Sequence, residues 1–307
     1  MKIIFMGTPE FATNSLQALI DNNFEILAVV TQPDKFQGRK QEVIYSPVKK
    51  LALENGLKVL QPNNIREEYK EIIALNADLI VTAAYGQILP QELLDAIPAI
   101  NVHGSLLPKY RGGAPIQYAL FDGLKKTGVT IMDMAFKMDS GDIILQDEVL
   151  IEDSDNYETL SNKLAILGAN LLIDVLNNNY PRRKQIESEV TYAYTLKRVD
   201  EFLDFYLDAD MVINRLRGLM PNIGGSFIIG DNIIKVFNLK KSDIIKDGQV
   251  GEVFLTNKKF LVKTKTAWLE ILEIQVPGKK RMKVAAFLNG QKIIKSGDLI
   301  ERKKDEY

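Results

Sequence analysis

Residues 2–11 read KIIFMGTPEF, and this stretch decides the fold. The apolar run that ends at Gly7 is typical of a buried strand. Pro9 suits the first turn of a helix with Thr8 as its N-cap, and apolar residues then follow at helical spacing. A buried strand that turns directly into a helix is the repeating unit of a parallel α/β sheet, so we expect that architecture here.

The same alternation continues to residue 102. We expect further strands at residues 25–31, 58–60, 77–83 and 99–102, with helices at 46–55 and 66–75. This rhythm predicts a Rossmann-like, doubly wound, mainly parallel sheet. Such sheets bind their ligands beyond the carboxyl ends of the strands, where loops meet helix N-termini.

The pattern changes in the rear of the chain. Two strands (129–134 and 143–150) and a helix (157–176) precede an exposed connector over residues 177–200. A short helix follows, and then come five short segments of alternating polarity separated by tight turns, at 225–229, 232–238, 251–255, 260–263 and 267–274. These segments predict a smaller, C-terminal OB-like β-barrel domain. We therefore expect domains at 1–180 and 207–307, joined by a linker at 181–206.

The amino-acid composition excludes several kinds of covalent and metal site. The chain has 307 residues, no cysteine and one histidine, which excludes disulfides and thiolate metal sites and disfavours any metal centre. The N-terminus lacks the apolar core of a signal peptide, so we expect a cytoplasmic protein. The formal net charge of −1 conceals an asymmetry: residues 1–207 carry a net −8 and residues 208–307 a net +7. A basic rear indicates either a polyanionic partner or lysine-rich solvated faces.

The segment from Asn101 to Pro108 is the sharpest chemical feature. Asn101 and His103 stand two apart at the end of an expected strand, so their side chains leave the same face. An amide beside an imidazole can donate to a developing oxyanion and move a proton. Asp139 can orient such a histidine and favour its charged form. Read singly, a histidine near a turn is more often structural, and Asp139 more often simply forms an Asx turn.

Two basic segments have two readings each. The polar loop at 31–40 contains Lys35, Arg39 and Lys40 within the acidic front of the chain, and residues 277–283 form a second basic run. Each is either a phosphate-contacting rim or ordinary surface charge. The turn after the first strand lacks the G-x-G-x-x-G fingerprint, so its amide groups offer either an anion site or a simple helix cap.

Taken together, these blocks resemble the folate-dependent formyltransferases. The resemblance covers most of the chain and lies in the following blocks: FMGTPEF (5–11), TQPD (31–34) with Gly38-Arg39, SPVK (46–49), AYGQILP (84–90), NVHGSLLP (101–108), YRGGAPIQ (110–117), TGVTIM (127–132) and DSGD (139–142). The Asn-x-His block with the later Asp is shared across the family. The Gly38-Arg39 loop, the Ala-Pro-Ile-Gln block and the basic rear resemble its tRNA-directed branch.

The resemblance implies transfer of the formyl group of 10-formyltetrahydrofolate to the α-amine of methionyl initiator tRNA, with no metal. It implies that Asn101, His103 and Asp139 are catalytic. It implies folate-binding residues Ser105, Leu106, Leu107, Pro108, Tyr85, Gly86, Ile88 and Asp142. It implies tRNA-binding residues Arg39, Lys35, Lys40, Lys279, Lys280, Arg281 and Lys283. An acceptor-end or methionyl pocket falls on Gly7, Thr8, Pro9, Glu10 and Phe11.

Other functions stay open at this point. A sugar-nucleotide N-formyltransferase shares the catalytic block but has no need for the Gly38-Arg39 loop or the basic rear. A tRNA- or anion-binding module without activity treats the three catalytic residues as coincidence, and a hydrolase releases formate without an acceptor. We expect the tRNA-directed enzyme, acting as a monomer without a membrane partner.

Overall fold

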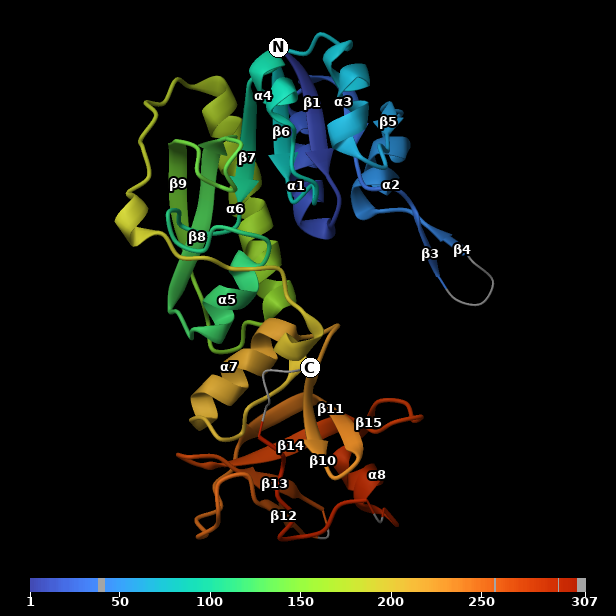
Figure 1. Ribbon diagram of the computed structural model, residues 1–307, viewed down its shortest axis with the longest axis vertical. Helices are drawn as coiled ribbons and strands as arrows, with labels where there is room; N and C mark the ends of the chain where they lie inside the picture. Colours follow the sequence, from blue (N-terminus) through green and yellow to red (C-terminus); the bar gives the residue numbers. More distant parts are fainter. Residues whose placement is uncertain (38–41, 257, 292, 303–307) are drawn as a thin grey trace. The chain divides into compact units, whose positions relative to one another are not determined.

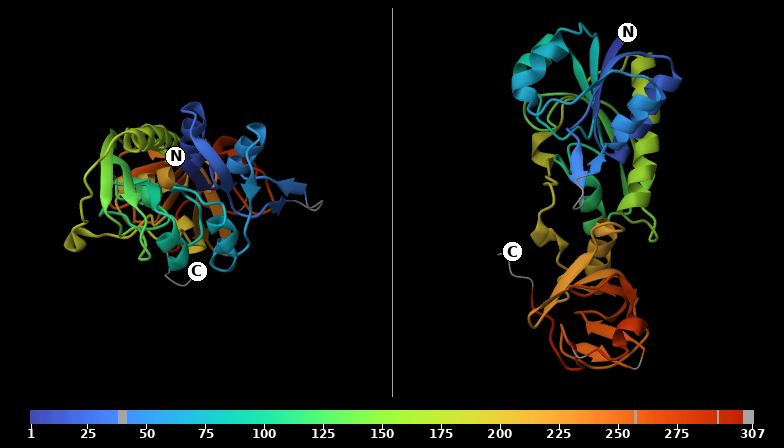
Figure 2. Two further views of the ribbon diagram at one scale, coloured as in Figure 1. Left: turned by 90° about the horizontal axis from the view of Figure 1, so that it is seen from above. Right: turned by 90° about the vertical axis from the view of Figure 1, so that its right-hand side faces the viewer.

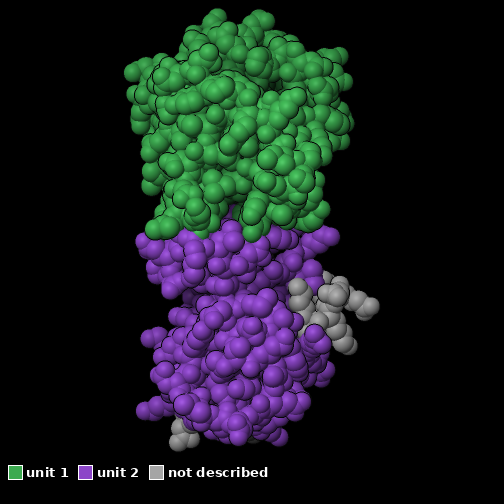
Figure 3. All heavy atoms as spheres, turned by 90° about the vertical axis from the view of Figure 1, so that its left-hand side faces the viewer, with its two compact units in different colours: residues 1–115, 126–150, 160–194 green, residues 116–125, 151–159, 195–307 purple. Residues whose placement is uncertain are grey.

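The computed structural model describes residues 1–37, 42–256, 258–291 and 293–302 (Figure 1). The chain forms two compact units, coloured separately in Figure 3. Unit 1 contains residues 1–115, 126–150 and 160–194, and unit 2 contains residues 116–125, 151–159 and 195–307. Unit 1 thus extends past residue 180 into the connector, and unit 2 includes two segments from the front of the chain.

Unit 1 is built on a seven-stranded sheet in the order β5-β2-β1-β6-β7-β8-β9. The strands are β1 (Lys2–Gly7), β2 (Glu25–Val30), β5 (Val59–Leu60), β6 (Leu79–Ala83), β7 (Ala99–His103), β8 (Lys126–Asp133) and β9 (Ile143–Leu150). Pairing is parallel from β5 through β7, whereas β8 and β9 add antiparallel strands at one edge. The predicted doubly wound, mainly parallel sheet is confirmed.

Helices cover both faces of this sheet (Figure 2). In unit 1 they are α1 (Glu10–Asp21), α2 (Pro47–Glu54), α3 (Ile65–Ile73), α4 (Gln91–Ala96) and most of α6 (Tyr157–Asn177), whereas α5 (Pro115–Phe121) belongs almost wholly to unit 2. On one face, Ile65 of α3 and Leu93 of α4 pack in one buried cluster with Ile4 of β1. Although α6 has the length and composition of a membrane-spanning helix, it is a core helix, because Gly168 lies against Val102 and Val129 of the sheet.

The predicted polar loop at 31–40 contains secondary structure. Two short strands, β3 (Lys35–Gln37) and β4 (Glu42–Ile44), pair as an antiparallel hairpin. Its base is fixed by Lys49 Nζ, which lies 2.6 Å from Asp34 Oδ2 and 2.6 Å from Gln61 Oε1. The Lys49 hydrogen bond holds the pKa of Asp34 below its ordinary value, and Gln61 Nε2, which donates to Asp34 Oδ1 at 2.9 Å, lowers it further. The TQPD and SPVK blocks of the sequence therefore meet in one anchor.

Unit 2 is an antiparallel half-barrel in the order β10-β11-β14-β13-β12, with β15 paired to β14. Its elements are η2 (Arg198–Glu201), α7 (Ala209–Leu219), β10 (Gly225–Ile229), β11 (Asn232–Lys241), β12 (Val253–Leu255), β13 (Phe260–Lys263), β14 (Trp268–Gln275), β15 (Met282–Lys283) and α8 (Val284–Leu288). All five predicted strands are present. β15 and α8 were not predicted, because elements of two and five residues carry little periodicity.

Candidate functional site

Asn101 lies on β7 and is oriented by the neighbouring strand. Thr82 of β6 pairs with Asn101 in the parallel register, and its hydroxyl lies 2.8 Å from Asn101 Oδ1. The single hydroxyl proton is therefore donated to this nearest acceptor, which leaves the amide Nδ2 as the available donor. Within the described residues, Nδ2 has no hydrogen-bond partner, so it can donate to a ligand at the carboxyl edge of the sheet.

His103 ends β7 with its side chain buried and one ring nitrogen anchored. Its Nε2 lies 3.0 Å from the backbone carbonyl oxygen of Tyr110. Because a carbonyl oxygen only accepts, Nε2 carries the proton in the neutral ring and Nδ1 carries the lone pair. The geometry therefore assigns Nδ1 as the atom that can accept a proton, a distinction that the sequence could not make.

Asp139 faces His103 without touching it. Its Oδ2 lies 3.8 Å from His103 Nδ1, beyond hydrogen-bond reach, and accepts a hydrogen bond of 2.7 Å from the backbone N–H of Gly112. The carboxylate thus reaches a second loop rather than closing its own Asx turn. At 3.8 Å the carboxylate is placed to act as the counter-charge of a protonated imidazole.

Backbone strain concentrates around this edge. Tyr110 (φ 61°) and Asp139 (φ 49°) adopt left-handed conformations, and so does Ala84 (φ 46°) at the end of β6. Residues other than Gly, Asn and Asp rarely adopt this region, so the strain lies at Tyr110 and Ala84, and strained residues of this kind cluster at functional sites. In this left-handed conformation the carbonyl of Tyr110 points toward His103 and accepts the hydrogen bond from its Nε2.

A buried arginine ties the connector to this site. Arg111 is fully buried, and its Nε and Nη2 donate 3.0 Å hydrogen bonds to Gln185 and Glu187 respectively. Its Nη1 is also buried and has no partner among the described residues. The pKa of Glu187 is held below its ordinary value, mainly by the Arg111 hydrogen bond and further by Lys137.

The connector also braces the loops on either side of Arg111. Gln185 Nε2 donates to the carbonyls of Asp139 and Gly141, both at 2.8 Å. The N–H of Tyr110 donates to Thr191 Oγ1 at 2.9 Å. Residues 111–114 form further backbone bonds with 191–193, and Figure 1 shows the connector running beside β9, where Arg183 pairs with Ile143.

The contacts between the connector and these loops could not be predicted from the sequence, because the connector is polar and has no periodic pattern. A signal is nevertheless present, because Arg111 stands within the YRGGAPIQ block that carries the family resemblance. Arg111 lies between the two backbone groups that matter: the carbonyl of Tyr110 holds His103, and the N–H of Gly112 holds Asp139.

The residues expected to bind folate fall into two groups. Three have side chains committed to the protein: Tyr85 and Leu107 pack in buried clusters, and Ser105 Oγ donates to the carbonyl of Lys109 at 2.6 Å. The remaining residues, exposed or half-buried at the sheet edge, are Gly86, Ile88, Leu106, Pro108 and Asp142. Backbone groups of the first set and side chains of the second set can therefore meet a ligand.

Tyr85 carries an unusual group for a core residue. Its hydroxyl is buried and has no hydrogen-bond partner among the described residues. Burial, with a smaller contribution from Glu68, raises the pKa of this phenol far above its ordinary value. The backbone carbonyl oxygen of Tyr85, in contrast, accepts two hydrogen bonds, from Thr8 Oγ1 at 2.9 Å and from Gln32 Nε2 at 3.1 Å.

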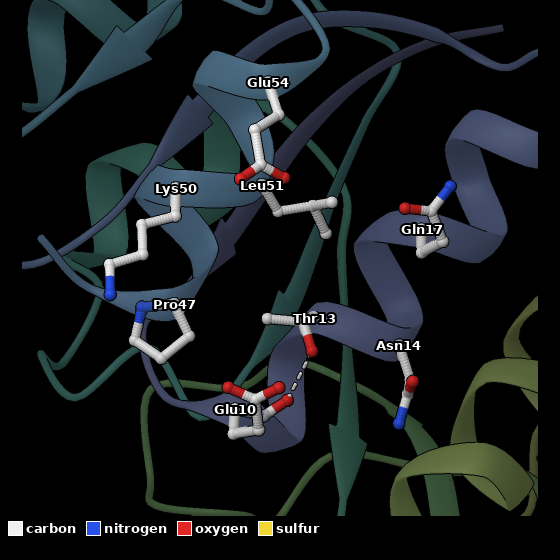
Figure 4. Close-up of a pocket in the computed structure, with 8 residues that line it drawn as sticks. All are labelled: Glu10, Thr13, Asn14, Gln17, Pro47, Lys50, Leu51 and Glu54. Atoms are coloured by element: carbon white, nitrogen blue, oxygen red, sulfur yellow. Dashed lines mark hydrogen bonds between the residues drawn. The ribbon is translucent and has the colours of Figure 1, made fainter.

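The predicted N-cap at Thr8 is wrong. The N-cap of α1 is Pro9, which has no side-chain cap bond, because the Thr8 hydroxyl instead joins the ends of β1 and β6 through Tyr85. Phe11 points into the core, and Gly7 packs closely against Ala83 of β6. Glu10 lines a surface pocket of ≈ 370 Å³ between α1 and α2 (Figure 4), whose lining includes none of the three expected catalytic residues.

The basic residues expected to meet tRNA differ in their surroundings. Lys35 is exposed on β3, and Arg39 and Lys40 lie outside the described residues. In unit 2, Arg281 is paired with Glu273 at 2.6 Å and stacks on Phe237, so its guanidinium is already engaged. Lys279, Lys280 and Lys283 are exposed. Across the part of the chain that the structure describes, no cluster of His, Cys, Asp and Glu could hold a metal ion.

Comparison with known proteins adds independent information. Residues 1–176 match the family model described as formyl transferase, and residues 195–292 match the one described as formyl transferase, C-terminal domain. The chain is 44% identical over 299 residues to the methionyl-tRNA formyltransferase of Bacillus licheniformis, covering 94% of this chain and 95% of that protein. It is 43% identical to the protein of the same name from Bacillus subtilis, with 97% of each covered.

Solved structures share the fold at lower identity. WlaRD, a sugar 3N-formyl transferase in the presence of dTDP and 5-N-formyl-THF, matches with a TM-score of 0.65 at 20% identity, covering 91% of this chain and 99% of that one. HypX from Aquifex aeolicus in complex with tetrahydrofolic acid matches with a TM-score of 0.63 at 15% identity. That match covers 94% of this chain and 47% of HypX, so the chain spans about half the length of HypX.

Proposed function

This chain belongs to the formyltransferase family, among the methionyl-tRNA formyltransferases. We therefore propose that it transfers the formyl group of 10-formyltetrahydrofolate to the α-amine of methionyl initiator tRNA. The observation that carries the proposal is the juxtaposition of Asn101, His103 and Asp139 at the carboxyl edge of the sheet. The three groups supply an oxyanion donor, a base and a counter-charge.

Attack by the amine creates negative charge on the formyl oxygen. The amine nitrogen bonds to the formyl carbon, and the C=O electron pair moves to oxygen. Asn101 Nδ2, held by the Thr82 bond to the opposite amide atom, donates to that oxyanion. A donor fixed before the reaction needs no reorganisation when the charge develops, so it stabilises the transition state more than the ground state.

His103 moves the proton. The attacking nitrogen becomes cationic and loses a proton to Nδ1, because Nε2 already donates to the Tyr110 carbonyl. Asp139, 3.8 Å away, stabilises the resulting imidazolium. When the bond between the formyl carbon and the folate nitrogen breaks, the same proton goes to that nitrogen. Formylmethionyl-tRNA and tetrahydrofolate leave, and the histidine is neutral again.

The substrates are assigned by chemistry and position. The folate lies against the loops that contain Gly86, Ile88, Leu106, Pro108 and Asp142, with backbone groups of Tyr85, Ser105 and Leu107 as further contacts. The methionyl end approaches the turn at residues 7–11. Basic residues contact the tRNA phosphates: Lys35, Arg39 and Lys40 in the front of the chain, and Lys279, Lys280, Arg281 and Lys283 in its rear. The enzyme acts as a cytoplasmic monomer with no metal and no membrane partner.

A formyl-transfer assay tests the proposal. The full chain is given 10-formyltetrahydrofolate with charged initiator tRNA or, separately, with a panel of amino-sugar nucleotides, at two salt concentrations. We expect formylmethionyl-tRNA at a rate that falls as salt rises, because phosphate contacts release counterions. Product on a sugar nucleotide alone would overturn the acceptor and keep the chemistry. Formate released equally without an acceptor would indicate a hydrolase.

A further inference from the structure

We propose that Tyr192 and Tyr194 form a stacking platform for the unpaired nucleotides at the acceptor end of the tRNA, an inference that rests on the function proposed above. The two rings lie nearly parallel, with centroids 5.7 Å apart and planes 9° apart. Tyr192 is 39% exposed and Tyr194 is 60% exposed. Neither ring serves the core of unit 1, so the pair leaves aromatic surface available for a ligand.

Backbone hydrogen bonds hold both rings on the outward face of the segment. Residues 191–194 run extended, so alternate side chains leave opposite faces. Ala193, between the two rings, is fully buried, and its backbone bonds to Arg111 and Ala114 at 2.8 and 3.1 Å. These bonds fix the segment and leave both tyrosines on the outward face. A platform built on fixed backbone loses little entropy when a base stacks on it.

The platform belongs to the same backbone as the catalytic base. Tyr192 pairs in parallel register with Arg111, and the preceding residue, Tyr110, holds His103 Nε2 through its carbonyl. The amine that reacts at His103 is attached to the last nucleotide of the tRNA, and we place the nucleotides before it along this segment. Those nucleotides are unpaired, and only unpaired bases can stack on side chains.

Two exposed lysines lie on the two segments that pair here. Lys109 directly precedes Tyr110, and Lys184 lies on the connector; both are exposed. In the residues that the structure describes, neither lysine side chain has an ion pair. Aromatic rings that stack bases, combined with cations that follow the phosphates, bind single-stranded nucleic acid without regard to sequence. We therefore commit to the single-stranded acceptor end as the occupant.

The test uses the full chain and initiator tRNA with 2-aminopurine in its unpaired acceptor end. Stacking on the wild-type rings is expected to quench the fluorescence of the probe. In the Y192L/Y194L variant, which keeps apolar cover but has no rings, we expect the quenching to be lost. We also expect KM for the charged tRNA to rise between about 5- and 150-fold, the effect of losing one stacked base. The kcat at saturation is expected to stay within about twofold of wild type, because stacking is uniform binding.

Two controls separate the possible failures. Y192F/Y194F keeps both rings and is expected to behave as wild type, and Ile166→Ala removes an equally exposed apolar group from α6. If Y192L/Y194L retains both the quenching and the KM of wild type, the platform is refuted. A fall in kcat with unchanged KM and quenching also refutes it, since the rings would then only cover the Arg111 loop. If wild type does not formylate methionyl-tRNA at all, the proposed function fails first.

Discussion

Gly112→Ala is the perturbation that most sharply tests how the connector holds the site. Gly112 has φ +125°, and a Cβ on it would lie 2.5 Å from the carbonyl oxygen of Ala193. Ordinary contacts require at least 3.0 to 3.4 Å, so the 191–193 segment would have to move by about 0.5 to 0.9 Å. The movement would disturb the Ala114 bond to Ala193 and the Gly112 bond to Asp139.

The expected consequence is a loss of turnover with substrate binding largely kept. A misplacement approaching 1 Å costs on the order of 100-fold in rate, so we expect kcat to fall by about that factor. The left-handed backbone adds a stability cost of about 1–3 kcal/mol for a residue with a Cβ. Steady-state formyl transfer gives kcat and both KM values, and urea unfolding gives the stability.

Gly56→Ala is the matched control. Gly56 also has a positive φ of +65°, but nothing lies within 4 Å of its hypothetical Cβ. We expect this variant to lose stability through backbone strain alone and to keep wild-type kcat. If Gly112→Ala loses stability like Gly56→Ala yet retains wild-type turnover, the claim that the connector positions Asp139 and His103 is refuted.

Three further changes probe single contacts. Thr82→Val removes the bond that orients Asn101, and we expect kcat to fall about 10- to 100-fold with folate KM unchanged; a rate within twofold of wild type would contradict the oriented oxyanion donor. Tyr85→Phe deletes a buried hydroxyl without a partner among the described residues, and urea unfolding should show a gain of about 1 kcal/mol, whereas a clear loss would reveal a missed partner. Glu187→Gln removes the counter-charge of buried Arg111. Because the pKa of Glu187 is lowered in the fold, its stabilising contribution is complete above its ordinary value of 4.5 and is lost as pH falls through the lowered pKa. The variant should thus be less stable than wild type at neutral pH and approach it in acid, and a constant difference across that range would contradict the pairing.

The sequence was informative where periodicity or a family pattern carries the signal. Long apolar runs located the strands of the parallel sheet and all five main strands of unit 2, because burial forces a regular pattern on them. The prediction that the side chains of Asn101 and His103 share a face followed from the two-residue repeat of a strand. Which chemistry these residues perform came from the resemblance, since an amide and an imidazole on a strand have many uses.

What could not be predicted depends on contacts between residues far apart in the chain. The tautomer of His103 is set by a carbonyl in the next loop, and that loop is set by a connector about 80 residues later. No periodicity records such contacts, because each is a single hydrogen bond between irregular segments. Thr8 shows the same limit, since its local preference as a cap lost to a bond with Tyr85.

The most direct test of the account exploits the single histidine of the chain. Nuclear magnetic resonance of protein labelled at both imidazole nitrogens reports on His103 alone. At a pH where the ring is neutral, the account predicts a proton on Nε2 and a lone pair on Nδ1, with Nδ1 taking up the proton on acidification. A neutral ring with its proton on Nδ1 would contradict the assignment of that atom as the base and the mechanism built on it.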